Sequence, residues 1–345
     1  MSIPVDLAVE QATILARCVF DFSFVGVKVG YTSAVEMSQL KVLFLAARPK
    51  FLIASAAPVL VGSAMGYSVS GFFNPLYFVL ALLAIMALHA GANIANDYYD
   101  HISRNDWVNV NPTPFSGGRR FIQQGILSPR ATLLESLFFL TVGSAIGVLL
   151  VLLTQSVFIL ILGLAGLLGG FFYTARPIQL GYRGVGEFVI AILFGLLPVY
   201  GSYYLQAGVV DLTPLLPATI VGVLIFLVIL VNEFPDLAAD AAVNKKTLIV
   251  SLGVPAGAWI YRVMLIVSFL PAAAMLSRPL TFYAGLFYLF TLPLAVVAIR
   301  AASPAELAKP SRYRASQLTV IMHTLGSLAL AAGLLIPRLW PLARV

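Results

Sequence analysis

Residues 214–240 read PLLPATIVGVLIFLVILVNEFPDLAAD, an apolar run of membrane-spanning length that ends in a cluster of acids. The part up to Asn232 carries no Asp, Glu, Lys or Arg, and about 20 such residues suffice for a helix to cross a bilayer. Residues 75–100 repeat the arrangement, because an uncharged run leads into Asn93-Ile-Ala-Asn-Asp97-Tyr-Tyr-Asp100. The two stretches predict membrane helices whose ends carry carboxylates.

The composition extends this prediction to the whole chain. Of the 345 residues, 60% are hydrophobic and 10% charged, against about 25% charged in a soluble domain. Uncharged apolar runs lie at 51–70, 75–96, 131–153, 156–174, 186–206, 214–232, 256–276, 280–299 and 316–337. The sequence therefore predicts an all-α, polytopic membrane bundle of about nine transmembrane helices around a central cavity that opens near the cytoplasmic side.

The basic residues predict how this bundle is oriented. The net charge is +7, but most Lys and Arg residues fall before the first span or in the connections after the even-numbered spans. Cytoplasmic loops carry such an excess, so the N-terminus and both acidic clusters are expected in the cytoplasm. We therefore expect a multi-pass protein of a bacterial or archaeal cell membrane. Orientation explains most of the basic excess, so nucleic acid is not expected as a partner.

The chain divides at about residue 45. Residues 1–45 mix acids with apolar residues and show no clear signal peptide, so we expect a cytoplasmic or interfacial extension there. Residues 46–345 are expected to form one nine-helix domain. Cys18 is the only cysteine, which excludes a disulfide framework and a thiolate metal site.

The acidic clusters predict a metal and phosphate site. On a helix each cluster lines one face: Asn93, Asp97 and Asp100 in the first, and Asn232, Asp236 and Asp240 in the second. Carboxylates at membrane depth are costly and indicate function. Oxygen ligands without nearby His or Cys select Mg²⁺ or a similar hard ion, with substrate phosphate completing its shell. These faces therefore favour a diphosphate substrate.

Other residues of the same connections are candidate substrate contacts. Arg119, Arg120, Lys245 and Lys246 can neutralise a diphosphate, although each can equally serve as an orientation signal. Tyr173 belongs to a group of rim aromatics that either form an interfacial belt or face the cavity and stabilise positive charge.

Several segments resemble the UbiA superfamily of intramembrane aromatic prenyltransferases. Asn96-Asp97-Tyr98-Tyr99-Asp100 resembles its first aspartate-rich motif and Asp236-Leu-Ala-Ala-Asp240 its second. Asp106 lies six residues after Asp100, and this spacing resembles that of the branch that makes menaquinone precursors. The same branch is suggested by further segments from residue 45 onward, namely Ala47-Arg-Pro-Lys50, Thr113-Pro-Phe-Ser-Gly-Gly118, Tyr182-Arg-Gly-Val-Gly-Glu187, Gly195-Leu-Leu-Pro-Val-Tyr-Gly-Ser-Tyr-Tyr204 and Asn244-Lys-Lys-Thr-Leu248.

The resemblance implies transfer of a polyprenyl chain from an allylic diphosphate to 1,4-dihydroxy-2-naphthoate. It also implies Mg²⁺, with Mn²⁺ as a substitute. The residues implied to hold the metal are Asp97, Asp100, Asp236 and Asp240; Asp106 is implied to assist, and the substrate contacts are Asn93, Asn96, Asn232, Arg119, Arg120, Lys245, Lys246 and Tyr173.

Two alternatives remain at this point. A UbiA-type enzyme can act on another acceptor, such as a phenolic acid, a chlorophyllide or a glycerol phosphate lipid. An ion-coupled membrane transporter also places Asp and Asn within a helical bundle, although acids beside basic loops fit phosphate better. The pair Arg119-Arg120 departs from the common family pattern, where smaller residues are expected.

Overall fold

A computed structural model describes residues 39–340 of this chain, so most of the extension expected at 1–45 lies outside the described residues. Residues 39–340 form helices and no β-strand. The elements are α2 (Gln39–Ala46), η1 (Pro49–Phe51), α3 (Ile53–Ser70), α4 (Pro75–Ile102), α5 (Asn105–Val108), α6 (Pro129–Thr154), α7 (Val157–Phe171), η2 (Leu180–Tyr182), α8 (Gly186–Ala191), η3 (Ile192–Leu196), α9 (Leu197–Ala207), α10 (Leu215–Ala242), α11 (Leu248–Val267), α12 (Phe269–Met275), α13 (Phe282–Leu289), α14 (Leu292–Ala301), α15 (Pro304–Leu307) and α16 (Arg314–Leu339). The all-α prediction is confirmed.

Local sequence signals explain where the long helices begin and end. Asn74 precedes Pro75 and accepts a hydrogen bond from the Tyr77 N–H, which caps the start of α4. Ser128 caps α6 and Thr247 caps α11 in the same way. Gly71 ends α3 in the left-handed conformation that glycine adopts without steric cost. The turns between spans are therefore encoded locally.

The predicted number of nine spans is not confirmed. Seven helical segments among the described residues are long and apolar enough to cross a membrane, and the pair α13 and α14, bent by 44°, makes eight at most. The run expected at 156–174 forms only the 15-residue helix α7. At 1.5 Å per residue this helix is about 22 Å long, which is shorter than the hydrocarbon core of about 30 Å. The protein is nevertheless a multi-pass membrane protein.

Two other predicted spans are interrupted. The run at 186–206 is divided into α8, the π-helical η3 and α9. The run at 256–276 begins earlier than expected, because α11 starts at Leu248 and is kinked at Gly253 before it continues toward α12. Hydropathy detects the apolar length of such a segment, but it does not detect a local change of helical pitch.

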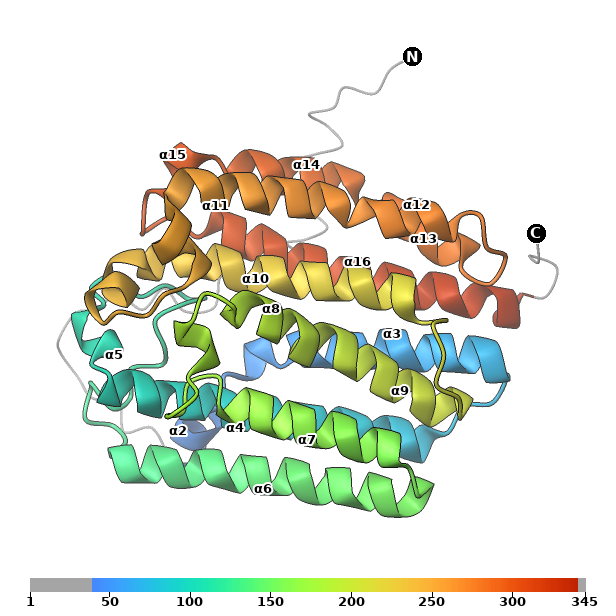
Figure 1. The fold of residues 1–345 in the computed structure, drawn as a ribbon, viewed down its shortest axis with the longest axis horizontal. Helices are drawn as coiled ribbons and strands as arrows, with labels where there is room; N and C mark the ends of the chain where they lie inside the picture. Colours follow the sequence, from blue (N-terminus) through green and yellow to red (C-terminus); the bar gives the residue numbers. More distant parts are fainter. Residues whose placement is uncertain (1–38, 341–345) are drawn as a thin grey trace.

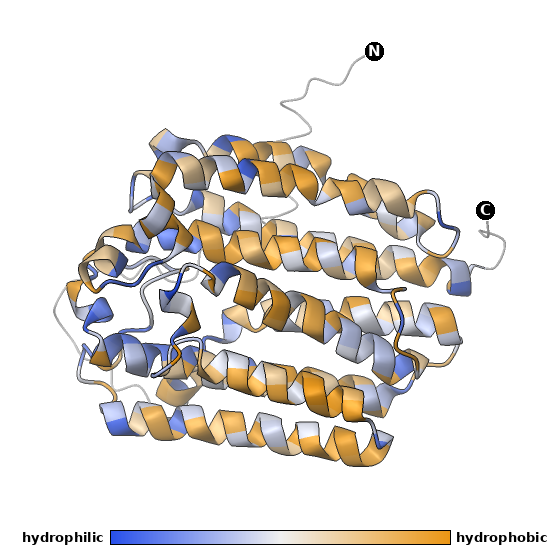
Figure 2. Cartoon of the chain, viewed as in Figure 1, coloured by the Kyte–Doolittle hydropathy of each residue, from blue (hydrophilic) through white to orange (hydrophobic). Residues whose placement is uncertain are grey.

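The long helices lie side by side, with α10 in the middle and α6 at one margin (Figure 1). Residues inside the protein make up 67% of the apolar window of α10 but only 17% of that of α6, which therefore faces lipid. Helices α5 and α15 and the connections 103–128 and 243–247 lie at the same end of the bundle, where hydrophilic residues gather (Figure 2). We call this the polar end.

Candidate active site

A cavity of about 190 Å³ opens between α4 and α10 at the polar end. Its polar part is lined by carboxylates, amides, Arg48 and Lys245, and its deeper part by apolar side chains. The deeper lining consists of Ala54, Ala92, Ile190, Phe194, Ile225, Val228 and Ile229, together with His89. A cavity with one charged and one apolar region suits a ligand that is charged at one end and hydrocarbon at the other.

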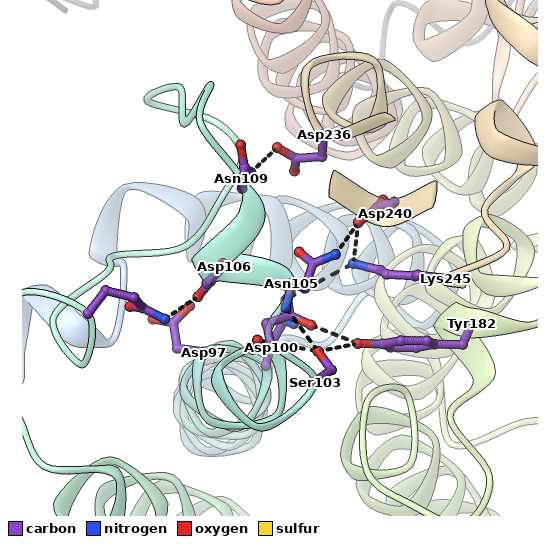
Figure 3. A network of polar contacts seen from close by, with 12 residues as sticks. Asp97, Asp100, Ser103, Asn105, Asp106, Asn109, Tyr182, Asp236, Asp240 and Lys245 are labelled. Atoms are coloured by element: carbon purple, nitrogen blue, oxygen red, sulfur yellow. Dashed lines mark hydrogen bonds and ion pairs between the residues drawn. The ribbon is translucent and has the colours of Figure 1, made fainter. Parts of the chain in front are cut away.

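The two carboxylates of α10 are held by amides of α5 (Figure 3). Asn105 donates from Nδ2 to Asp240 Oδ1 at 2.8 Å, and Asn109, the residue that follows α5, donates from Nδ2 to Asp236 Oδ1 at 2.8 Å. The two asparagines are four residues apart, so they lie on one face of a helical turn. Helix α5 therefore orients both carboxylates of α10.

Lys245 joins the two acidic faces. Its Nζ lies 3.4 Å from Asp240 Oδ1 on α10 and 3.9 Å from Asp100 Oδ2 on α4. Burial alone would lower the pKa of Lys245, but the charges of Asp100 and Asp240 outweigh it and raise the pKa well above its ordinary value. Lys245 is therefore a permanent cation at the polar part of the cavity.

Asp100 has two further partners. Asn96 donates to its Oδ2 at 2.5 Å, and the Tyr182 hydroxyl donates to its Oδ1 at 3.1 Å. Burial and then the charge of Asp100 raise the pKa of Tyr182, so the phenol remains a hydrogen-bond donor at neutral pH. The Tyr182 hydroxyl also lies 3.1 Å from Ser103 Oγ, which fixes its position.

Asp97 lies outside the cavity lining. Its carboxylate pairs with Arg48, and it accepts the backbone N–H of Arg119 at 3.4 Å. Burial would lower the pKa of Arg48, but Asp97 and then Asp106 raise it. Burial and the charges of Asp100 and Asp97 raise the pKa of Asp106 itself to about 8.

The connection after α5 folds over the site. Thr113 Oγ1 accepts the backbone N–H groups of Phe115 and Ser116 at 3.1 and 3.0 Å, which closes a tight turn. Gly118 follows with φ of 68°, and a Cβ there would lie 2.9 Å from Asp97 Oδ1. Only glycine lets the backbone pass this close to the carboxylate. The residues from Phe115 to Gly118 thereby become part of the cavity wall.

Of the residues singled out from the sequence, the cavity brings together Asn93, Asn96, Asp100, Tyr173, Asn232, Asp236, Asp240 and Lys245. It does not include Asp97, Asp106, Arg119, Arg120 or Lys246. Asp97, Arg119 and Arg120 bind other parts of the chain instead.

The three basic residues that do not line the cavity have different surroundings. Arg119 donates from Nε to the Leu45 carbonyl at 2.9 Å, and Arg120 donates from Nη1 to the Asn109 carbonyl at 2.6 Å. Lys246 is exposed, and its backbone N–H donates to the Tyr182 carbonyl at 3.4 Å. Arg120 thus helps to hold the asparagine that orients Asp236, whereas the Lys246 side chain does not line the cavity.

Three of the four predicted metal ligands, Asp100, Asp236 and Asp240, line the cavity, and Asp97 does not. Within residues 39–340 no group of three or more His, Cys, Asp or Glu side chains is close enough to hold a metal ion. The carboxylates are neutralised by Arg48 and Lys245 instead. The donor set nevertheless fits a hard cation, because Asp100, Asp236 and Asp240 line one cavity with amide oxygens beside them.

Several residues that build the site were not among the site residues predicted from the sequence. Arg48, Asn105, Asn109 and Tyr182 each bind one of the predicted carboxylates. The spacing of Asn105 and Asn109 was a detectable signal, since two amides four residues apart follow the first acidic cluster directly. The pairing of Arg48 with Asp97 spans 49 positions and has no local signal.

The bundle is that of a membrane protein, and its cavity is polar at one end and apolar at the other. The model of the UbiA prenyltransferase family matches residues 55–325, and the chain belongs to this family. It is therefore a prenyltransferase, and the ion-coupled transporter is not supported.

Relatives cover most of the chain. A 1,4-dihydroxy-2-naphthoate octaprenyltransferase from Haemophilus influenzae is 31% identical over 86% of this chain and 97% of its own length. A 2-carboxy-1,4-naphthoquinone phytyltransferase from Synechocystis is 27% identical over 84% and 92%. Among solved structures, a UbiA homologue from Archaeoglobus fulgidus bound to DMAPP and Mg²⁺ has a TM-score of 0.61 at 15% identity, and the match covers 84% of this chain and 99% of that one. This likeness shows the fold.

Proposed function

We propose that this prenyltransferase moves a polyprenyl chain from an allylic diphosphate to 1,4-dihydroxy-2-naphthoate, in a reaction that depends on Mg²⁺ and serves menaquinone synthesis. One observation carries the proposal: a single cavity joins a carboxylate and lysine region to an apolar region. The acceptor is inferred from the relative of Haemophilus influenzae, which bears that name at 31% identity.

The residues that would hold the metal are the carboxylates in the cavity wall, Asp100, Asp236 and Asp240. Asp97 stands behind them and is bound to Arg48. Bound Mg²⁺ would neutralise the diphosphate and stabilise it as a leaving group. Mn²⁺ has the same preference for oxygen ligands, so we expect it to substitute.

Other residues of the cavity would bind the diphosphate and the hydrocarbon chain. Lys245 is a buried cation that can donate to phosphate oxygens. The apolar wall formed by Phe194, Ile225 and Ile229 would hold the first part of the hydrocarbon chain. By excluding water, it would protect the allylic cation that forms when the bond to diphosphate breaks.

We also propose that the polar end faces the cytoplasm of a bacterial or archaeal cell membrane. The support is the concentration of Lys and Arg in the connections of that end. A water-soluble aromatic acid and diphosphate would then enter and leave on the side where the acidic clusters lie.

The test is an assay of the purified full-length protein with Mg²⁺ and a radiolabelled allylic diphosphate. The acceptors would be 1,4-dihydroxy-2-naphthoate, 4-hydroxybenzoate, a chlorophyllide and a glycerol phosphate lipid, with products identified by mass. We expect the naphthoate to be prenylated with loss of CO₂. Chelation should abolish turnover, Mg²⁺ or Mn²⁺ should restore it, and Zn²⁺ should not. Preferred transfer to another acceptor would overturn the proposed acceptor, and full activity in excess chelator would overturn the metal role.

A further inference from the structure

A layer of polar residues lies one to two helical turns deeper in the cavity than the carboxylates. Asn93 precedes Asp100 by seven residues on α4, and Glu233 precedes Asp236 by three residues on α10. At 1.5 Å per residue, Asn93 and Glu233 are about 10 Å and about 5 Å further from the polar end than these carboxylates. Asn93, Asn232, Glu233 and Tyr173 all belong to the cavity wall. They therefore face whatever lies just beyond a bound diphosphate.

Several atoms of this layer are buried without a hydrogen-bond partner. They are Asn93 Nδ2, Asn232 Oδ1 and Glu233 Oε2. Oε2 of Glu187, which does not line the cavity, has no partner either. Glu233 is 9% exposed and Glu187 is 1% exposed. Buried polar groups in proteins are rarely left unpaired. Unpaired donors and acceptors that face one cavity indicate a ligand that carries hydroxyl or carboxyl groups.

Glu187 is the acidic neighbour of Glu233 outside the cavity wall. Its Oε1 accepts the Leu248 N–H at 2.6 Å, which holds the Glu187 carboxylate in place. Glu233 faces the cavity with Oε2 unpaired, so its carboxylate can accept a proton from a bound ligand.

The other cavity-lining candidate for a base is placed too deep. His89 is in the cavity wall, and its Nδ1 lies 2.7 Å from Ser55 Oγ. It precedes Asp100 by 11 residues on α4, which corresponds to about 16 Å. The reacting carbon of an allylic diphosphate is bonded directly to the phosphate oxygen. That carbon therefore falls nearer to Glu233 than to His89, which lies one further helical turn below Asn93.

We propose that Glu233 is the general base that removes the ring-hydroxyl proton of the aromatic acceptor. This inference rests on the proposed function and assigns a catalytic residue to it. Asn93 and Asn232 would bind the oxygen substituents of the same ring, because their unpaired amide atoms face the same space.

Proton transfer to Glu233 accompanies the attack of the ring on the allylic carbon. The acceptor O–H bond breaks, the proton moves to Glu233, and the electron pair raises the nucleophilicity of the ring. A ring carbon bonds to the allylic carbon while the bond from that carbon to diphosphate breaks, and diphosphate leaves with the electron pair. If the attacked carbon carries the carboxylate, CO₂ leaves and its bonding electrons restore the aromatic ring. The ring oxygen then recovers the proton from Glu233, which is ready for another turnover.

The test compares Glu233→Gln with Glu135→Gln in the full-length protein. Glu135 on α6 is a matched control, because it is 8% exposed, both of its carboxyl oxygens lack a partner, and it is not in the cavity wall. General-base catalysis contributes about a hundredfold or more. We expect Glu233→Gln to lower kcat by that factor and to leave the donor KM within about threefold. Glu135→Gln should keep wild-type kinetics.

An acceptor with a ring hydroxyl that is already ionised at the assay pH gives an independent readout. With a ring-fluorinated naphthoate of this kind, the kcat of Glu233→Gln should be at least about tenfold higher than with the ordinary acceptor, because no base is then needed. This acceptor should not rescue Asp236→Asn. The kcat of Glu233→Gln should also rise with pH as the ordinary acceptor ionises. Tyr173, Asp240 and Lys245 are the other titratable groups that face Glu233, and all three are retained in this variant.

Unchanged kcat in Glu233→Gln, or an equal loss with the ionised acceptor, would overturn the assignment. If Glu233→Gln does not fold, Glu187→Gln carries the test, because glutamine keeps an oxygen for the Leu248 N–H while it removes the charge. Glu187→Gln should lower kcat about tenfold and respond to the ionised acceptor in the same way. Failure of the wild-type enzyme to prenylate any hydroxylated ring would instead count against the proposed function.

Discussion

The acidic ends of α4 and α10 look alike in the sequence but differ in the structure. Each has an asparagine followed by two aspartates on one helix face. On α10 both carboxylates line the cavity, and α5 amides orient them. On α4 only Asp100 lines the cavity, whereas Asp97 is outside the lining and is paired with Arg48, which does line the cavity. The difference teaches that spacing selects a helix face, whereas the partners of a carboxylate decide what it can bind.

The largest effect is expected on α10. Asp236→Asn and Asp240→Asn should each lower kcat by about a hundredfold or more, because a charged group that stabilises the departing diphosphate is lost. The Mg²⁺ concentration for half-maximal activity should rise as well, since an amide oxygen is a weaker ligand than a carboxylate. Metal titrations of turnover measure both changes. Retention of more than about a tenth of the wild-type rate, a loss below about 1.4 kcal/mol, would remove that residue from the metal site.

Asp97→Asn should act mainly on stability. The substitution leaves the buried Arg48 without its carboxylate, and an unpaired buried charge costs about 3 kcal/mol. We expect a lower Tm, a loss of activity of about tenfold, and an unchanged Mg²⁺ requirement. The double variant with Arg48→Gln should recover part of the Tm. If Asp97→Asn raises the Mg²⁺ requirement as much as Asp236→Asn does, Asp97 is a metal ligand as the sequence predicts.

The neighbours Lys245 and Lys246 also differ in their surroundings. Lys245 lies between the two acidic faces, and Lys246 is exposed. Lys245→Gln should raise the donor KM about tenfold, because a hydrogen bond to a charged group contributes about 1.5 kcal/mol. Lys246→Gln should leave the donor and acceptor kinetics within about twofold. Wild-type donor kinetics in both variants would assign the two lysines to membrane orientation alone.

The smallest effect is expected in the connection that covers Asp97. Gly118 and Gly125 share a φ of 68°, but a Cβ would meet Asp97 and Asp106 at Gly118 and nothing within 4 Å at Gly125. Alanine at either position should cost about 1 kcal/mol or more through backbone strain. Only Gly118→Ala should also lower kcat, by about threefold, because it displaces the carboxylates. Similar kcat values in the two variants would show that the contact with Asp97 does not matter.

Much of the fold was predictable because it depends on local properties. Uncharged apolar length predicted the membrane helices, and Asn74-Pro75 and Ser128-Pro129 mark helix starts that need no distant partner. The number of spans was overestimated at α7, which is only 15 residues long. The sharp bend between α13 and α14 and the π-helical η3 also escaped prediction. Such interruptions depend on how neighbouring helices pack, and hydropathy does not report packing.

The sequence by itself determined the class of the protein, most of its helices and the placement of its acids on helix faces, because helical spacing places Asp236 and Asp240 on one side whatever surrounds them. Only the tertiary structure decided that Asp97 faces Arg48, that Asn105 and Asn109 hold the α10 carboxylates, and that Glu233 meets Glu187. These contacts join residues 46 to 135 positions apart. Such pairings depend on the order in which helices pack, and no local pattern in the chain encodes that order.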